Sequence, residues 1–311
     1  MQDEALARFL ATGDHDPFRY GASQEGLSRA HDELIDGLIA EVKRRARGRR
    51  SPRVPKGFDP VSFSRAKLEP MVRGLFPRAE QDVVLAMLET SVVFVTRRNI
   101  ERLLREESFL SSARTLANLY LGMVGAELLS EDSPRLVGFS EHMTCYVSPL
   151  YFREDGPFAD FIVHEAAHVF HNCKRRTIGL PHTRRREWLL DIEFGKRETF
   201  AYCCEAFSRI AESTTKRVER VAMASRLGAR HWPPDERVDP SEFADILEAA
   251  CGARNGWKVI LRRCAPVRVP RARYEPPNAV TAVILPSNLG DLCHTVTMLA
   301  ESMSTVCWIG A

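Results

Sequence analysis

The ten residues from 161 to 170 read Phe-Ile-Val-His-Glu-Ala-Ala-His-Val-Phe, and they decide how this 311-residue chain is interpreted. His164 and His168 are four residues apart, and Glu165 directly follows the first histidine. Side chains four residues apart lie on one face of an α-helix, so both imidazoles can face a single zinc ion. Glu165 stands beside that pair, where it can take a proton from a zinc-bound water and deliver it to a leaving group. The H-E-x-x-H spacing therefore predicts a helix that carries a hydrolytic zinc site.

The residues around this motif favour a buried helix. Phe158, Ile162, Ala166, Val169 and Cys173 recur at helical spacing and form one apolar stripe. The two histidines point to a side roughly 140° away from that stripe, toward an expected cleft. The alternative is an amphipathic helix whose histidines bind no metal, and metal content distinguishes the two interpretations.

A catalytic zinc site needs a third protein ligand and an open position. The extended metzincin motif is excluded, because the positions where it requires glycine and histidine hold Phe170 and Lys174. Residues 197–211 offer a different ligand, since their helical pattern places Glu198 and Tyr202 on a polar face opposite an apolar one. Glu198 is the predicted third ligand.

Two other glutamates stay open as third ligands. Glu205 lies on the same predicted helix face as Glu198, but Arg209 is four residues later and offers it an ordinary ion pair. Glu193 is a weaker alternative, because Gly195 separates it from the strongest part of the helical pattern. For every one of these residues, a solvated helix face is the competing interpretation.

With these residues, the segment from about 140 to 212 resembles the zincin metallopeptidases of the gluzincin type. The resemblance implies a zinc-dependent hydrolase of peptide bonds, with His164, His168 and Glu198 as ligands and Glu165 as the general base. Many gluzincins have an aspartate four residues after the glutamate ligand, where it holds a histidine ligand. This chain has Tyr202 there, and its phenol is expected either to donate a hydrogen bond in the transition state or to pack at the edge of the cleft.

The remaining histidines have weaker assignments. His171 is seven residues from His164, about 10 Å of helix rise, so it is expected to contact the site without joining the metal ligands, or to lie on the surface. His142, His182 and His231 are candidate transition-state donors, and the sequence does not choose among them.

The expected fold class is α+β and predominantly helical, with a zincin-like core in which a short sheet precedes the metal-binding helix. Residues 135–139 and 143–148 have the pattern of short strands, and residues 91–96 form either a third strand or part of a helix from 80 to 105. Zincins lay an extended substrate along a sheet edge, so strand addition is the expected mode of peptide binding.

Outside this core, composition and the positions of proline and glycine indicate where helices and linkers lie. A helical stretch over residues 24–47 is followed by a proline-containing linker at 48–60, and residues 280–285 could form one more strand. The chain is expected to divide into three parts. Residues 1–56 form an N-terminal helical region with a basic linker, residues 57–215 form the catalytic domain, and residues 216–311 form a mainly helical C-terminal region.

The sequence predicts a cytosolic protein without a membrane span, because Met1 precedes no hydrophobic signal and no apolar run approaches about 18 residues. Eight cysteines include no C-x-x-C pair, which favours reduced core residues over disulfides or a second zinc site. The expected partner is a protein or peptide substrate, and the oligomeric state is open.

The charge balance gives no general signature of a nucleic-acid-binding protein, since 44 basic and 41 acidic residues leave a net charge of +3. Basic residues do gather at 43–50, 174–176 and 184–186, where solvated linkers or helix ends are favoured over contact with nucleic acid. Three hypotheses result: a zinc peptidase, a catalytically silent zincin-like regulatory or binding protein, and a helical nucleic-acid-binding or regulatory protein in which the H-E-x-x-H motif is accidental.

Overall fold

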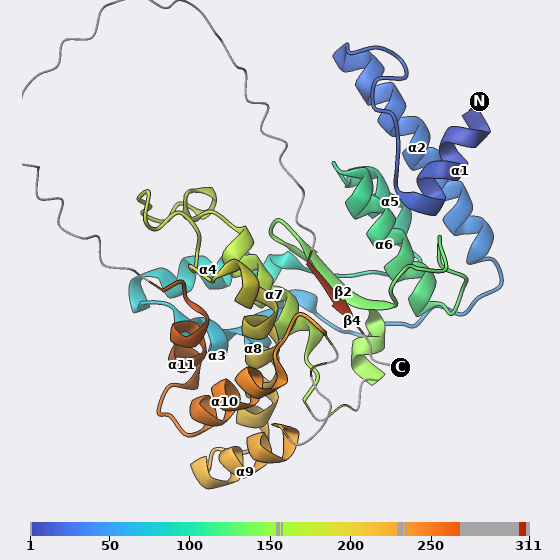
Figure 1. Ribbon diagram of the computed structural model, residues 1–311. Helices are drawn as coiled ribbons and strands as arrows, with labels where there is room; N and C mark the ends of the chain where they lie inside the picture. The colour runs from blue at the N-terminus through green and yellow to red at the C-terminus, as the bar shows by residue number, and fades with distance from the viewer. Residues whose placement is uncertain are drawn as a thin grey trace, which may run out of the picture.

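The computed structural model describes residues 2–153, 156, 158–228, 233, 235–267 and 305–308 (Figure 1). Helices predominate in the described residues, and a small sheet lies among them, so the predicted helix-rich α+β class is confirmed at that level. The α-helices are α1 Gln2–Thr12, α2 Gln24–Arg45, α3 Pro60–Leu75, α4 Arg78–Ser91, α5 Ile100–Glu106, α6 Leu110–Met123, α7 Phe161–Asn172, α8 Arg197–Ser213, α9 Arg217–Gly228, α10 Pro240–Cys251 and α11 Gly256–Cys264. The strands are β1 Val92–Phe94, β2 Leu136–Glu141, β3 Thr144–Val147 and β4 Thr305–Trp308, and the 3-10 helices are η1 Pro149–Arg153, η2 Arg175–Ile178 and η3 Phe194–Lys196.

The sheet has the strand order β1-β3-β2-β4. β1 runs parallel to β3, whereas β2 is antiparallel both to β3 and to β4. A two-residue turn joins β2 to β3, and His142 within it has a φ of 51°, which is the left-handed region. The strands predicted at 135–139 and 143–148 are confirmed as β2 and β3.

The segment from residue 80 to 105 contains a strand between two helices. α4 ends at Ser91, and Val92–Phe94 then pairs with Cys145–Val147 of β3. β-branched and aromatic side chains suit this strand locally. The pairing partner, which lies more than fifty residues later, decides against a continuous helix.

Helices cover both faces of the sheet (Figure 1). Cys145 and Val147 of β3 belong to a large hydrophobic cluster with α3, α4, α7, α8, α10 and α11. Tyr146 and Phe139 belong to a second cluster with α1, α2, α5 and α6. Because side chains alternate along a strand, a single short sheet serves two hydrophobic cores.

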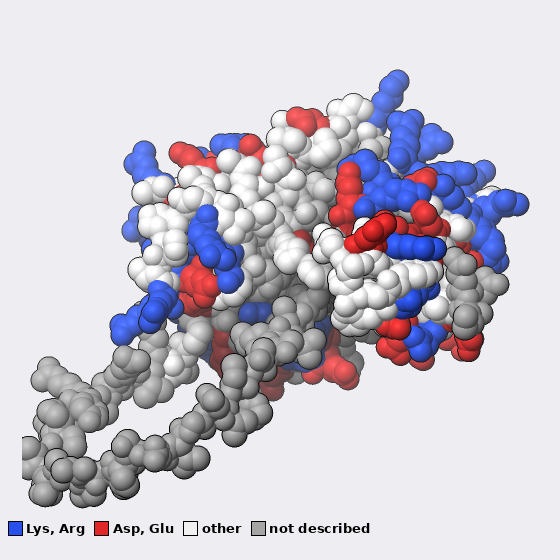
Figure 2. Space-filling model, turned by 90° about the horizontal axis from the view of Figure 1, so that it is seen from above, with Lys and Arg blue, Asp and Glu red and all other residues white. Residues whose placement is uncertain are grey.

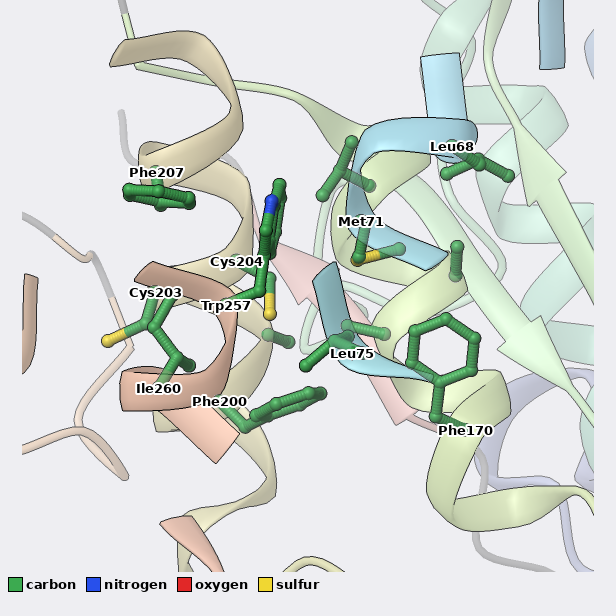
Figure 3. Packing of buried hydrophobic residues seen from close by; sticks show 14 of the residues in the cluster. Leu68, Met71, Leu75, Phe170, Phe200, Cys203, Cys204, Phe207, Trp257 and Ile260 are labelled. Atoms are coloured by element: carbon green, nitrogen blue, oxygen red, sulfur yellow. The ribbon is translucent and has the colours of Figure 1, made fainter. Parts of the chain in front are cut away.

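The larger cluster fixes the two helices that carry the candidate site. Leu68, Met71 and Leu75 of α3 face Phe170 of α7, while side chains of α8 and α11 close the other side (Figure 3). α3 and α11 approach closely at Gly74, where an added Cβ would lie only 2.1 Å from the Trp257 ring. Packing on several sides therefore sets the position of α7 relative to α8.

The helix predicted at residues 24–47 is confirmed as α2, and residues 48–59 contain no helix or strand, as expected for the linker. The strand expected at 280–285 lies outside the described residues. The three-part division at residues 56 and 215 stays a prediction, although α10 and α11 share their hydrophobic cluster with α7 and α8.

None of the described helices is long and apolar enough to cross a membrane. Every cysteine whose side chain is described is free and buried, in keeping with the expected core role: Cys145, Cys173, Cys203, Cys204, Cys251 and Cys264.

Candidate metal centre

α7 presents the H-E-x-x-H residues from the middle of the larger core. Asp160 caps its N-terminus by accepting a hydrogen bond from the backbone N–H of Val163. His164, Glu165 and His168 have no solvent exposure. The predicted buried helix is confirmed, and the site in this state is enclosed by protein.

Three side chains converge at this point: His164 and His168 of α7 and Glu198 of α8. The two Nε2 atoms are 3.1 Å apart, and Glu198 Oε2 lies 3.7 Å from the first and 3.5 Å from the second. Ligand atoms about 2.05 Å from a tetrahedral zinc ion would be separated by about 3.3 Å. The donor types and their spacing therefore fit a zinc ion.

Glu205 orients the first histidine. Its Oε2 lies 3.0 Å from His164 Nδ1, and its Oε1 accepts a hydrogen bond of 2.6 Å from the backbone N–H of Asp160. When Nδ1–H donates to Glu205, the Nε2 lone pair of His164 is free to bind a metal. Arg209, the expected partner of Glu205, pairs with Glu212 instead.

His171 holds the second histidine in the same manner. It is buried, and its Nε2 lies 3.3 Å from His168 Nδ1. Burial lowers the pKa of both His168 and His171, which favours the neutral imidazole that metals bind. His171 therefore contacts the site without being part of the ligand group. This is one of the two positions that the sequence predicts for it; the other is the protein surface.

Glu165 lies between the ligand helix and the sheet. Neither of its carboxylate oxygens accepts a well-formed hydrogen bond from the described residues. Burial raises its pKa to about 8, and the nearby His164 imidazole and Ser140 hydroxyl offset only part of that rise. Burying a carboxyl group without firm hydrogen-bond partners destabilises the folded state, so a purely structural role does not explain this residue. A role as a proton carrier does.

Gly138 of β2 makes room for this carboxyl group. A Cβ at position 138 would lie 3.2 Å from both Cγ and Oε1 of Glu165. The glycine stands inside a strand that the sequence predicts, where glycine often marks a close approach by another group. The sequence could have indicated that another group approaches Gly138 closely. It could not have indicated that this group is the side chain of Glu165.

Arg237 is a site residue that sequence reasoning missed. Its Nη1 lies 3.2 Å from Glu198 Oε1, so Glu198 directs one oxygen to the histidines and the other to a cation. Asp235 holds Arg237 through contacts as short as 2.6 Å. Burial opposes ionisation of Glu198, but His168 and His164 outweigh it and hold the pKa of Glu198 below its usual range. No spacing rule in the sequence connects residue 237 with residue 198.

Tyr202 packs against the first histidine, with ring centroids 4.5 Å apart at an interplanar angle of 75°. The ring contact places the residue at the site, and the predicted donation to a transition state stays a prediction.

The other candidates do not join the ligand group. Glu193 is exposed at the start of η3, and His182 is exposed as well. His142 lies in the exposed turn between β2 and β3, with its Nε2 3.6 Å from Glu141. His231 lies outside the described residues.

Comparison of the chain with protein families, with curated proteins and with solved structures found no match.

Proposed function

We propose that this chain is a zinc-dependent peptidase of the zincin type, similar to the gluzincins. The observation that carries the proposal is the convergence of His164, His168 and Glu198 beside the buried, weakly partnered carboxyl group of Glu165. A structural zinc site is normally closed by four protein ligands, whereas three ligands leave one position for chemistry.

Each residue has a distinct part in this proposal. The zinc ion would polarise the scissile carbonyl group and lower the pKa of a water molecule. Glu165 would act as the proton carrier, accepting a proton from the attacking water and delivering it to the leaving amine. Glu205 and Arg237 hold His164 and Glu198 in their orientations.

Strand addition to β2 is the expected mode of substrate binding, and it requires β4 to leave, because β2 is an inner strand of the described sheet. Gly138 places β2 against Glu165, so a peptide that adds a strand to the outer edge of β2 would pass the site. In this state β4 of the same chain pairs with that edge, from Leu136 to Ser140, and it also contacts α7. Substrate would therefore replace β4.

The first test is the zinc content of the purified protein, measured by elemental analysis. About one zinc per chain is expected, with strong loss in His164→Ala and Glu198→Ala. Glu193→Ala is the matched control, because it removes an exposed glutamate near the start of α8 and should keep the metal. A protein that binds no zinc after reconstitution contradicts the proposal.

The second test separates a peptidase from a catalytically silent zincin-like protein. Glu165→Gln removes the base and retains the ligands, so zinc should stay bound while hydrolysis of a mixed peptide library falls by about 100-fold or more. If zinc binds and neither the native protein nor the variant cleaves any peptide, the silent binding protein is the correct alternative.

A further inference from the structure

A second candidate site lies away from the ligand group, at the linker between α2 and α3. The structure has a cavity of about 1310 Å³ there. Its walls come from the linker, the turn after β1, the end of α6, and η1. Among the described residues that line it, seven are basic and none is acidic: Arg49, Arg50, Arg53, Lys56, Arg97, Arg98 and Arg153.

In the described part of the chain, no carboxylate pairs with the basic side chains of this cavity. All seven of these side chains are exposed. The nearby helical end of the molecule, from α1, α2, α5 and α6, is different: Figure 2 shows acidic side chains interspersed among its Lys and Arg. Examples there are the pairs of Lys43 with Glu101 and of Arg105 with Asp36.

Three residues of the other two basic runs form contacts with carboxylates of the fold. Arg175 is fully buried and donates a hydrogen bond of 2.7 Å to Glu80, which Arg186 also contacts. Lys174 pairs with Glu187. Only the end of the first run, at residues 49–50, contributes to the basic cavity.

The topology of the sheet brings these cations together. β1 and β3 are parallel, so their carboxyl ends reach the same edge, and the basic residues of 97–98 and of η1 follow them there. The turn after β1 is fixed, because Asn99 accepts a 2.7 Å hydrogen bond from the Thr96 N–H and donates one of 2.9 Å to the Phe94 carbonyl. Hydrogen bonds within the fold therefore fix the part of the cavity wall that the turn after β1 forms.

The lining of the cavity also includes an aromatic ring and two prolines next to the basic side chains. Phe58 lines the cavity and packs edge-on against Phe94 and Phe152, with ring centroids 5.3 and 4.9 Å away. Pro52 and Pro55 line it as well. Positive groups that follow a phosphate backbone, next to flat surfaces on which bases can stack, are the combination that single-stranded nucleic acids require.

The composition and size of the cavity narrow the ligand class. Six of the seven cations are arginines, whose forked guanidinium matches phosphate oxygens in pairs. The volume of about 1310 Å³ exceeds the range of about 300 to 1,000 Å³ typical of small-molecule pockets. A concave site fits neither a flat bilayer nor a rigid duplex as well as it fits a flexible strand.

We propose that this basic cavity binds the sugar–phosphate backbone of a single-stranded nucleic acid. The proposal is independent of the peptidase assignment, because no ligand residue of the candidate metal centre lines the cavity.

The test is fluorescence anisotropy of the full chain with a labelled oligo(dT) of about 12 nucleotides, titrated at several salt concentrations. The native protein should bind with an affinity that falls steeply with salt. Arg97→Ala/Arg98→Ala should weaken binding about tenfold or more and make the log–log salt slope shallower by about 1.4, since each phosphate contact contributes about 0.7 for single strands.

Arg102→Ala/Arg105→Ala is the matched control, because it removes the same charge from the adjoining helix α5, where both arginines pair with carboxylates. Arg49→Ala/Arg53→Ala tests the linker residues of the cavity if the first variant does not fold. Arg97→Lys/Arg98→Lys keeps the charge but removes the forked donors, so it should keep the salt slope and lose part of the affinity. Equal weakening by the cavity and control variants, or tighter binding to polyglutamate, to duplex DNA or to anionic lipid vesicles, would overturn the proposal.

Discussion

At the scale of single residues, the arrangement around His164 explains how an ordinary histidine becomes fit to bind a metal. A free imidazole can rotate and exchange tautomers, and the 3.0 Å contact with Glu205 removes both freedoms. Glu205 itself is fixed by the N–H of Asp160 at the start of the same helix. If the proposed metal binds, its affinity should therefore depend on a glutamate that is outside the ligand group.

Glu205→Gln should weaken zinc binding by about 10- to 100-fold, because the amide is a poorer hydrogen-bond acceptor for the Nδ1–H of His164. Competition with a chelator of known affinity gives the measurement. Glu212→Gln, on the same helix, is the control and should leave zinc affinity unchanged. An unaltered affinity in Glu205→Gln would show that the orientation of His164 does not depend on this contact.

At the scale of elements, the pairing of β4 with β2 has the clearest functional consequence. Thr305–Val306 lie opposite Ser140 and Phe139, and so they occupy backbone groups that an extended substrate would use. Under the proposed function, β4 would therefore keep substrate from this edge.

Removal of residues 302–311 should raise the rate of peptide hydrolysis, since the outer edge of β2 becomes available. Val306→Pro in the full chain should act in the same direction, because proline has no N–H to donate to β2. Hydrogen exchange at residues 138–140 gives a readout that does not need activity, and it should quicken in both variants. Unchanged exchange would mean that β4 does not protect this edge.

The C-terminal end of α2 provides a test of pH dependence. Glu41 accepts hydrogen bonds of 2.7 and 2.6 Å from Arg44 and Arg45, and these hold its pKa near 2, below the ordinary value of 4.5. A lowered pKa stabilises the folded state above the unfolded value, and the contribution is lost as pH falls from 4.5 toward 2.

Glu41→Gln should lower the free energy of unfolding by about 1 kcal/mol at neutral pH, a figure reduced by the exposure of Arg44, and by almost nothing near pH 2. Urea denaturation across this pH range measures both values. Glu248→Gln, an exposed glutamate of α10, is the control. If Glu41→Gln lowers the free energy of unfolding equally at neutral pH and near pH 2, the charge of the carboxylate is not the cause of the loss.

At the scale of the whole molecule, the ligand group joins two central helices of the larger hydrophobic cluster. His164 and His168 come from α7 and Glu198 from α8, so a bound metal would stabilise the folded state and not the unfolded chain. Without it, the carboxyl groups of Glu165 and Glu198 stay buried near each other. The stability of the fold should therefore depend on metal.

Chelation should lower the melting temperature by several degrees, and added zinc should restore it. A free zinc concentration a thousandfold above the dissociation constant stabilises the folded state by about 4 kcal/mol. Differential scanning calorimetry with and without chelator measures the shift, and Glu198→Ala should show almost none. Identical melting curves for native protein with and without metal would exclude coupling between the site and the fold.

Local sequence patterns predicted the elements and part of the candidate site. The four-residue spacing of His164 and His168 places both rings on one helix face whatever surrounds them, and the apolar residues beside them require a buried helix. Residues 135–139 and 143–148 similarly have the pattern of short strands, and the second is rich in β-forming residues. These features follow from helix and strand geometry, which the chain determines locally.

Tertiary packing decided the rest. Glu198 and Glu205 are seven residues apart on one face of α8, about 10.5 Å along its axis, so helical periodicity cannot distinguish them. Only the position of α8 against α7 brings Glu198 to both histidines and Glu205 to the far side of one ring. The same holds for Arg237 and for the basic cavity, which combine residues from segments far apart in the chain. Such neighbours are set by the packing of whole elements, and no local period in the sequence records them.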